Sequence, residues 1–301
     1  GSEIQITFHG GNAVLKKRSL IGYTILSLAL TAMAAIVWLF CTTSGTRLVV
    51  ETLFRWMPVK VEAERITGKL ANDLTLEGVR LTWESGEARV VTVHLKLQPL
   101  YLLAGSVSVE EMDVRHVSII DSSPESGPPY DLKWPRAPFL LAAARGRIGD
   151  FRAEDVSYQK PGRDPVTIQE CRGEVIWSRG STLSIRNVVI RMPDALAEGS
   201  VQAGLLFPSL QANLSVALNK AAVNCNAFSL TATLEAGQEP EQVSGTIRLV
   251  AASGTDVQAL LEGEIGLTRK AVLFRNLRFV DGEGNAMVNA DGRVDVSTSE
   301  I

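Results

Sequence analysis

The sequence LTLEGVRL at residues 74–81 sets the fold that we expect for most of this chain. Leu74 and Leu76 alternate with polar residues, as in a strand with one apolar face, and the alternation then slips by one position before Val79 and Leu81. Without that slip, the second half of the strand would turn its apolar side chains to the opposite face. A glutamate and a glycine occupy the slip, and both suit a β-bulge. The stretch therefore predicts a bent strand that keeps one face apolar.

The same pattern, apolar-x-apolar-x-x-apolar-x-apolar, recurs along the chain. The residues at each slip are polar or glycine, as expected of a bulge or of a corner that faces water. Coincidence in a β-rich chain is the alternative. The copies begin at Leu74, Val107, Phe151, Leu183 and Val272, and their slips fall at Glu77-Gly78, Glu110-Glu111, Glu154-Asp155, Arg186-Asn187 and Arg275-Asn276.

Plain alternation fills much of the remaining chain, for example at 59–64, 91–97 and 210–218. We therefore predict a mainly β chain whose antiparallel strands each present one apolar face. That face must be covered. A second sheet would give a closed sandwich, whereas one sheet curled into a trough would leave an apolar groove open to acyl chains. Alternation alone does not choose between the two.

A membrane anchor is predicted before the strands. The run LIGYTILSLALTAMAAIVWLF at residues 20–40 spans about 31 Å as a helix, close to the thickness of a bilayer core. A cleaved signal peptide is the alternative, but its apolar core would be shorter. The basic cluster before the run places the N-terminus in the cytoplasm and the bulk of the chain across the membrane, and aromatic residues mark the two interfaces. The residues that set this orientation are Lys16, Lys17, Arg18, Tyr23 and Trp38.

Six segments follow from these patterns. The segment rich in proline excludes a central strand; it is a simple loop, a hinge between two parts of one sheet or a loop that binds a partner. The segments are a cytoplasmic N-terminus whose first residues could derive from cloning (1–18), the anchor (19–41), a short amphipathic helix (47–57), a first β segment (58–120), the proline-rich loop (121–138) and a second β segment that we expect to continue beyond this chain (139–301).

The composition predicts neither catalysis nor nucleic-acid binding. The net charge is −3 and aromatic residues make up 6% of the chain, so neither a basic field nor a base-stacking platform is expected. No catalytic or phosphate-binding motif is present. The three cysteines and three histidines lack metal-ligand spacing, although Cys171 and Cys225 could pair in an oxidising compartment. We therefore predict no enzyme activity, no metal and no cofactor.

Residues 41–120 resemble the N-terminus of the TamB family, whose members belong to the translocation and assembly module of Gram-negative bacteria; the pattern also fits the wider AsmA-like proteins. The resemblance is clear over about 80 residues. It is carried by Thr42-Thr43-Ser44-Gly45, Arg55-Trp56-Met57-Pro58, Ile66-Thr67-Gly68-Lys69-Leu70, Leu74-Thr75-Leu76-Glu77-Gly78-Val79, Gln98-Pro99-Leu100 and Gly105-Ser106-Val107.

This resemblance implies a periplasmic β-taco with a groove open to lipid, held in the bacterial inner membrane by one helix. It implies an outer-membrane β-barrel partner, TamA, and a role in outer-membrane biogenesis. Our leading hypothesis is a non-enzymatic protein that moves phospholipid between the two membranes. Alternatives are a scaffold for the insertion or secretion of outer-membrane proteins such as autotransporters, a bridge component for lipopolysaccharide, and a periplasmic enzyme.

The predicted groove would solvate acyl chains collectively, so no single residue should be essential. A charged residue in place of Val93 or Leu95 should obstruct transport while the protein still folds. The predicted lining residues are Leu74, Leu76, Val79, Leu81, Val91, Val93, Leu95, Leu97, Val107, Val109, Val114, Val201, Leu214, Val216 and Leu249.

Overall fold

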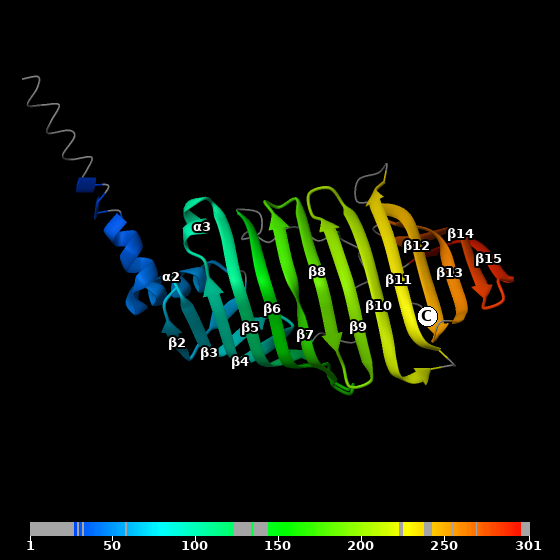
Figure 1. Cartoon of the computed structure of the whole chain (residues 1–301), viewed down its shortest axis with the longest axis horizontal. Helices are drawn as coiled ribbons and strands as arrows, with labels where there is room; N and C mark the ends of the chain where they lie inside the picture. Colours follow the sequence, from blue (N-terminus) through cyan, green and yellow to red (C-terminus); the bar gives the residue numbers. More distant parts are fainter. Residues whose placement is uncertain are drawn as a thin grey trace, which may run out of the picture.

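The structure, a computed structural model, describes residues 27–28, 30–31, 33–57, 59–122, 134, 144–222, 225–237, 243–254, 256–268 and 270–295. In this part of the chain, fifteen strands form a single sheet, and helix α2 lies at its first end (Figure 1). The elements are α2 (Thr43–Trp56), β1 (Lys60–Glu62), β2 (Arg65–Gly68), β3 (Asp73–Trp83), β4 (Gly86–Leu97), α3 (Leu100–Leu103), β5 (Ser106–Asp121), β6 (Arg145–Gln159), β7 (Val166–Ser178), β8 (Thr182–Arg191), β9 (Ala195–Gly204), β10 (Ser209–Ala222), β11 (Cys225–Ala236), β12 (Val243–Ser253), β13 (Asp256–Leu267), β14 (Ala271–Asp281) and β15 (Ala286–Asp295).

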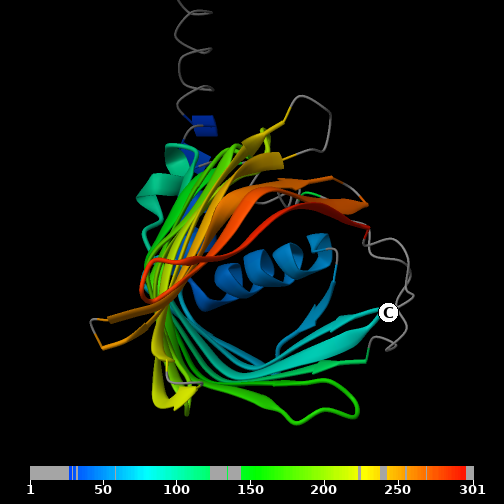
Figure 2. The ribbon, with the colours of Figure 1, turned by 90° about the vertical axis from the view of Figure 1, so that its right-hand side faces the viewer.

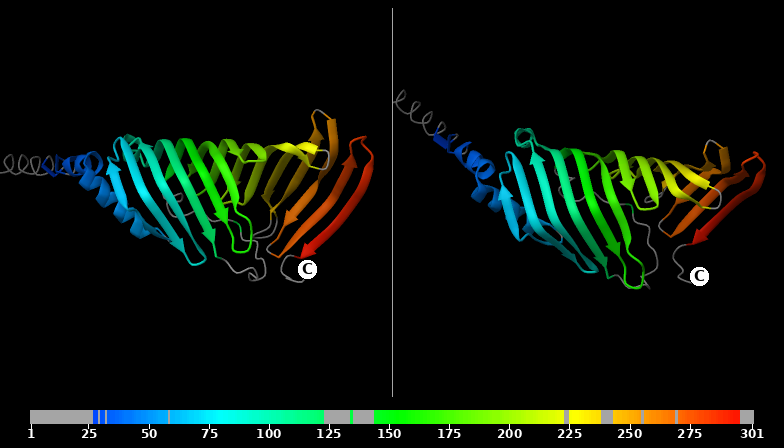
Figure 3. Two further views of the ribbon diagram at one scale, coloured as in Figure 1. Left: turned by 90° about the horizontal axis from the view of Figure 1, so that it is seen from below. Right: turned by 60° about the horizontal axis from the view of Figure 1, so that its bottom comes forward.

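The sheet is curved into a trough, and its strands run from one lip of the trough to the other (Figure 2). The strands follow one another in chain order, except that β1 and β2 share the outer edge of β3. At about 4.8 Å per strand, the row from β1 to β15 is about 60 Å long. Two further views show the same single layer (Figure 3). Because all the described strands belong to one sheet, the trough is observed and the sandwich is not.

The predicted slips are confirmed as backbone irregularities. At four of the five predicted positions, the second slip residue has a positive φ of 50–62°. These residues are Gly78, Asp155, Asn187 and Asn276. At the fifth position the register between β4 and β5 shifts around Glu110, because Leu97 pairs with Val109 whereas Lys96 pairs with Glu111. Each strand thus keeps its apolar side chains on one face across the bend.

A further irregularity in β5 was not predicted. His116 has a positive φ of 55° and lies opposite Val91 in β4 and Asp155 in β6, outside the regular pairing. Its Nε2 is 3.5 Å from Oδ2 of Asp155. The irregular positions of β3 to β6 are therefore aligned across the sheet, and we infer that this alignment lets neighbouring strands bend together.

The prediction of an antiparallel sheet is wrong at one strand pair, because β5 and β6 are parallel. Ser106 pairs with Arg145 and Ile120 pairs with Gln159, so both strands begin at the same lip. A parallel neighbour requires a connection of a dozen or more residues, and residues 122–144 supply that length. The predicted loop at 121–138 lies almost entirely outside the described residues; within it, Asp121 ends β5 and Trp134 Nε1 donates a hydrogen bond to the carbonyl of Gly204 at 2.6 Å.

Helix α2 begins before the predicted residue 47 because Thr42 caps it. The Thr42 side chain accepts a hydrogen bond from the Gly45 amide at 3.1 Å. Met57 ends the helix in an extended conformation, as is usual for a residue that precedes proline. The helix lies inside the curve of the trough (Figure 2). Its Val50, only 4% exposed, and its Phe54 pack against the apolar face of β3 to β6.

Hydrogen bonds fix the position of α2. Thr46 is fully buried, and its Oγ1 accepts the Leu70 amide at 3.0 Å, just before β3 begins. The Ala71 amide donates to the carbonyl of Phe40 at 2.9 Å. The other end of α2 leads into β1, which pairs with the far end of β3. The helix therefore crosses the trough from one lip to the other at the first end of the sheet.

The predicted anchor falls mainly on residues outside the described part of the chain, including Lys16, Lys17, Arg18 and Tyr23. Among the described helices, none is by itself both long and apolar enough to cross a bilayer. The helices Met33–Cys41 and Thr43–Arg55 meet the length and composition criteria only as a pair, and they are bent by 85° at their junction. Trp38 is exposed on the first of them.

Candidate functional site: the apolar inner face

The register of the strands joins their apolar residues into continuous rows. Directly paired residues share one face of a sheet, so the pairing identifies neighbours without reference to side-chain conformation. One row can be followed through ten successive strand pairs without meeting a polar side chain other than a thiol. It runs through Leu76, Val93, Val114, Ala153, Cys171, Ile190, Ala197, Val216, Phe228, Ala251 and Ala259.

A second row runs beside the first, nearer the lip at which β5 begins. It comprises Val109, Ile148, Val175, Ile185, Val201, Ala212, Ala232 and Ile247. The face that carries these rows is the concave one, because α2 packs on it through Val50 and Phe54 and lies within the curve (Figure 2). The inside of the trough is therefore apolar from β3 to β13.

The convex face carries charged side chains that pair across the strands. Arg115 contacts Glu154 at 3.5 Å, and Arg152 and Arg191 both contact Glu170, at 3.3 and 3.5 Å. The arginine side chains are about half exposed to water, which screens the charges, so we expect each pair to add little stability. On the same face, Lys96 donates a hydrogen bond to Glu110, and this bond together with the negative charges of Glu110 and Glu111 raises the pKa of Lys96. The outer face is thus an ordinary solvated surface.

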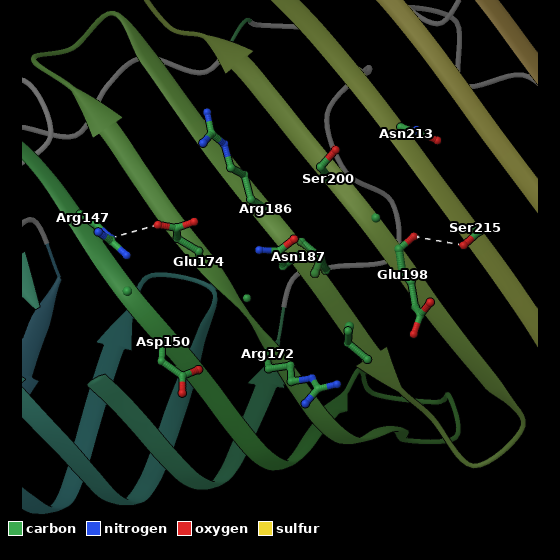
Figure 4. A pocket seen from close by; sticks show the side chains of 15 residues that line it. Arg147, Asp150, Arg172, Glu174, Arg186, Asn187, Glu198, Ser200, Asn213 and Ser215 are labelled. Atoms are coloured by element: carbon green, nitrogen blue, oxygen red, sulfur yellow. Dashed lines mark hydrogen bonds and ion pairs between the residues drawn. The ribbon is translucent and has the colours of Figure 1, made fainter. Parts of the chain in front are cut away.

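A shallow depression of about 1030 Å³ lies on the convex face, over β6 to β10 (Figure 4). It exists because Gly149, Gly173 and Gly199 carry no side chains there; a Cβ on Gly199 would lie only 2.0 Å from the carbonyl oxygen of Asn213. Its lining is polar, and Arg147 is paired with Glu174 at 2.9 Å. This depression lies on the opposite side of the sheet from the apolar rows, so it is not part of the groove.

Helix α2 divides the apolar face into two parts. Under α2, the side chains of β3 to β6 are buried, and Leu74 is only 2% exposed. In β8, by contrast, Leu183, Ile185, Val188 and Ile190 are half-buried. The first part of the trough is therefore filled by α2. No described helix or second sheet lies over the second part, β7 to β13, although Ala212, Ala232, Leu234 and Val243 of β10 to β12 are buried.

The structure places the predicted lining residues in three environments. Those of β3 and β4 other than Val91, together with Val114 of β5, lie in or against the cluster that α2 covers. Val107 and Val109 lie on β5, and Val201, Leu214, Val216 and Leu249 lie on the uncovered part, from β9 to β12. The residues in or against the α2 cluster are Leu74, Leu76, Val79, Leu81, Val93, Leu95, Leu97 and Val114.

Val91 departs from the predicted inner row. It is 58% exposed, whereas its neighbour Val90 is 8% exposed and pairs with Val79 and Val117. The alternation around it predicts the opposite, because the strand was read as regular from residue 91 onward. Val91 lies opposite the irregular Gly78, and the apolar pattern of β4 slips by one residue here, so that Val90 and Val93 both face the core.

Several residues of the rows were not among the predicted lining. Ala153, Cys171 and Ile190 continue the row of Val93 and Val114. Ala153 and Ile190 belong to copies of the slip pattern, which was a usable signal, whereas Cys171 stands in a strand without that pattern.

The three cysteines, Cys41 among them, are unpaired. Burial raises the pKa of the Cys171 thiol. Among the described residues, no group of three or more His, Cys, Asp or Glu is placed to hold a metal ion.

These features define a class of protein: a single-layer β trough with an apolar interior and a helix across one end. Residues 32–133 match the family model described as TamB, N-terminal domain. Over these residues the chain is similar to the N-terminal domain of TamB. Neither the comparison with curated proteins nor that with solved structures gave a match.

TamB proteins form a family of periplasmic proteins anchored in the inner membrane, and the family is associated with the translocation and assembly module. TamB-like proteins are not known as enzymes, and the described structure offers no positive evidence for catalysis. The matched residues extend from the helix before α2 through β5, so the match covers the part of the trough that α2 fills except for β6.

Proposed function

We propose that this chain is a conduit that carries phospholipid between the inner and outer membranes. The observation that supports this proposal is the continuous apolar face of β7 to β13, which no described element covers. Each methylene that such a surface shields from water gains about 0.8 kcal/mol. Acyl chains could therefore lie along the rows while their headgroups remain near the open side of the trough.

The test is site-specific photo-crosslinking in membranes that contain the full chain and its partner. A photoreactive residue replaces Val201 on the inner row, and a matched one replaces its exposed neighbour Gln202 on the outer face. We expect phospholipid to be captured at position 201 and not at 202. Equal capture at both positions, or capture at neither, would refute the conduit.

The proposed placement is a single-pass anchor with a cytoplasmic N-terminus and a periplasmic trough. Exposed apolar side chains on the helix before α2 support it, namely Leu28, Leu30, Met33, Ile36 and Val37. In this arrangement TamA, the outer-membrane barrel, would receive the other end of the trough. A reporter fused after β15 that is active in the cytoplasm instead of the periplasm would contradict this topology.

One observation favours a second candidate, a scaffold for outer-membrane proteins. Every described residue of β15 is exposed, and the edge of β15 away from β14 has no partner strand among the described residues. An unpaired edge can accept a client strand by β-augmentation. Crosslinkers at Met287 or Arg293 that capture polypeptide, with none capturing lipid at position 201, would favour the scaffold.

A further inference from the structure

A second hollow lies at the first end of the trough, where the chain passes from α2 into β1. It has a volume of about 630 Å³ and is enclosed by α2, β1 and β2. Its polar wall holds four basic and three acidic side chains, and its apolar side includes Phe54, Val61 and Ile66. These three pack against the cluster beneath α2, so the hollow is continuous with the apolar inner face.

Most charges in this hollow are already paired. Arg47 contacts Glu51 at 2.7 Å and Lys60 contacts Glu62 at 2.7 Å. A hydrogen bond from Lys60 is the main reason that the pKa of Glu62 is lowered. Arg65 points to Glu77, at 3.4 Å, which lies outside the lining.

One cation and one anion of the lining remain without an ion pair among the described residues: Arg55, in the last turn of α2, and Glu64, between β1 and β2. Glu64 is held toward the sheet because Gly78 leaves room for it; a Cβ on Gly78 would lie 2.5 Å from the Glu64 carboxyl carbon. Arg55 is exposed. The hollow thus offers one free guanidinium and one free carboxylate beside an apolar wall.

The location of the hollow narrows the class of ligand that it could bind. α2 is bent by 85° from the helix Met33–Cys41, whose exposed side chains are apolar. If that helix stands along the bilayer normal, α2 lies flat at the membrane surface and the hollow lies at headgroup level. A guanidinium binds a phosphodiester through two parallel hydrogen bonds, and a carboxylate accepts hydrogen bonds from a primary ammonium.

We propose that the hollow between α2, β1 and β2 binds the zwitterionic headgroup of a phospholipid that carries a primary ammonium, such as phosphatidylethanolamine. Arg55 holds the phosphodiester, Glu64 holds the ammonium, and the acyl chains lie against Phe54 and Ile66. This site rests on the proposed conduit, for which it supplies the point where lipid leaves the inner membrane. The helix across the end of the trough is then one wall of the loading site.

The test uses the full chain in lipid nanodiscs with a photoreactive residue at Val59, which lines the hollow. Nanodiscs contain phosphatidylethanolamine, phosphatidylglycerol or phosphatidylcholine. We expect the first lipid to be captured about tenfold more than either of the others. Phosphatidylcholine tests whether the lipid's ammonium group must donate N–H hydrogen bonds, since its ammonium carries no hydrogen. Phosphatidylglycerol, which has no ammonium group, tests whether the headgroup must carry a positive charge.

Two variants separate the roles of the charges. R55Q should lower the capture of every phospholipid about tenfold, and E64Q should abolish the preference for phosphatidylethanolamine while capture of phosphatidylglycerol persists. The control R163Q removes an exposed arginine from the turn between β6 and β7 and should change nothing. Unchanged hydrogen exchange of α2 verifies that each variant is folded.

Equal capture of the three lipids, or capture by R55Q at the wild-type level, would refute the proposed headgroup site. A crosslinker at Val201 in the same nanodiscs reports on the conduit separately. Lipid captured at 201 without selectivity at 59 removes the headgroup site and leaves the conduit standing. Selective capture at 59 with none at 201 supports the headgroup site and refutes the conduit.

Discussion

Replacement of Thr46 by valine should release α2 from the trough. The Thr46 hydroxyl is completely buried and accepts the Leu70 amide at 3.0 Å. Valine has nearly the same shape and a similar helix propensity, so the substitution removes the acceptor with little change in packing. A buried N–H left without a partner costs about 1–3 kcal/mol, which raises the opening equilibrium of α2 roughly 5- to 150-fold.

Hydrogen exchange of the full chain in nanodiscs measures this effect directly, because exchange of a protected amide follows its local opening equilibrium. Peptides that cover α2 and Leu70 should exchange faster in T46V, whereas β10 to β13 should not change. The matched control is T52V, which makes the same chemical change on the same helix at an exposed residue whose hydroxyl bonds to the Leu48 carbonyl. T46S, which retains the hydroxyl, should lie between the wild type and T46V.

If T46V exchanges at the wild-type rate, or only as fast as T52V, then the bond to Leu70 does not hold α2 in place. The proposal that this bond keeps α2 over the apolar face of β3 to β6 would then be wrong. Faster exchange throughout the sheet would also contradict it, since α2 packs on the face of β3 to β6 and leaves β7 to β13 uncovered.

Three further predictions concern the sheet itself. N187V should destabilise the protein by about 1–2 kcal/mol in chemical denaturation because Asn187 has a φ of 52°, whereas the control N213V, at an exposed position with regular pairing, should be nearly neutral. Hydrogen bonds from the amides of Asn285 and Glu283 lower the pKa of Asp281, so the stability they give the β14–β15 turn is present near pH 7 and is lost as the pH falls below the normal aspartate range; D281N should abolish this pH dependence of turn exchange. Burial raises the pKa of Cys171, so its labelling by a charged maleimide should still accelerate through about pH 9, and a plateau near pH 8 would contradict this.

The bends of the strands were predictable from sequence because they depend on local pattern alone. An apolar alternation that slips at Asn187 or Asn276 can keep one face buried only with an extra residue, and asparagine is among the few residues that tolerate a positive φ. His116 was missed although the same slip marks it, because Met112 and Val114 are followed by Val117 and Ile119, with Arg115 and His116 between them. Val91 was misplaced for a related reason: it is an apolar residue within the slip of its own strand, between Val90 and Val93, which both face the core.

The arrangement of elements was less predictable than their existence. Alternation is the same in parallel and antiparallel neighbours, so nothing in Ser106–Asp121 or Arg145–Gln159 signals that β5 and β6 are parallel; only the length of the connection permits it. The amphipathic pattern of α2 shows that one side is buried, but not that it is buried inside the trough. That placement depends on the hydrogen bond from Leu70 to Thr46, 24 positions apart in the chain.

The position of α2 changes where the conduit can be tested. From sequence, a charged residue at Val93 should obstruct transport and leave folding intact. In the structure Val93 is 8% exposed and lies in the cluster beneath α2, so a carboxylate there is buried without a partner and should cost several kcal/mol of stability. Val201 is half-buried on the uncovered part of the same face, where an aspartate remains near water. V93D should therefore lower the amount of folded protein, whereas V201D should fold and still lose lipid capture at downstream positions such as Ile247. If V93D and V201D accumulate to equal levels, α2 does not seal the first part of the trough, and lipid would have the whole apolar face available to it.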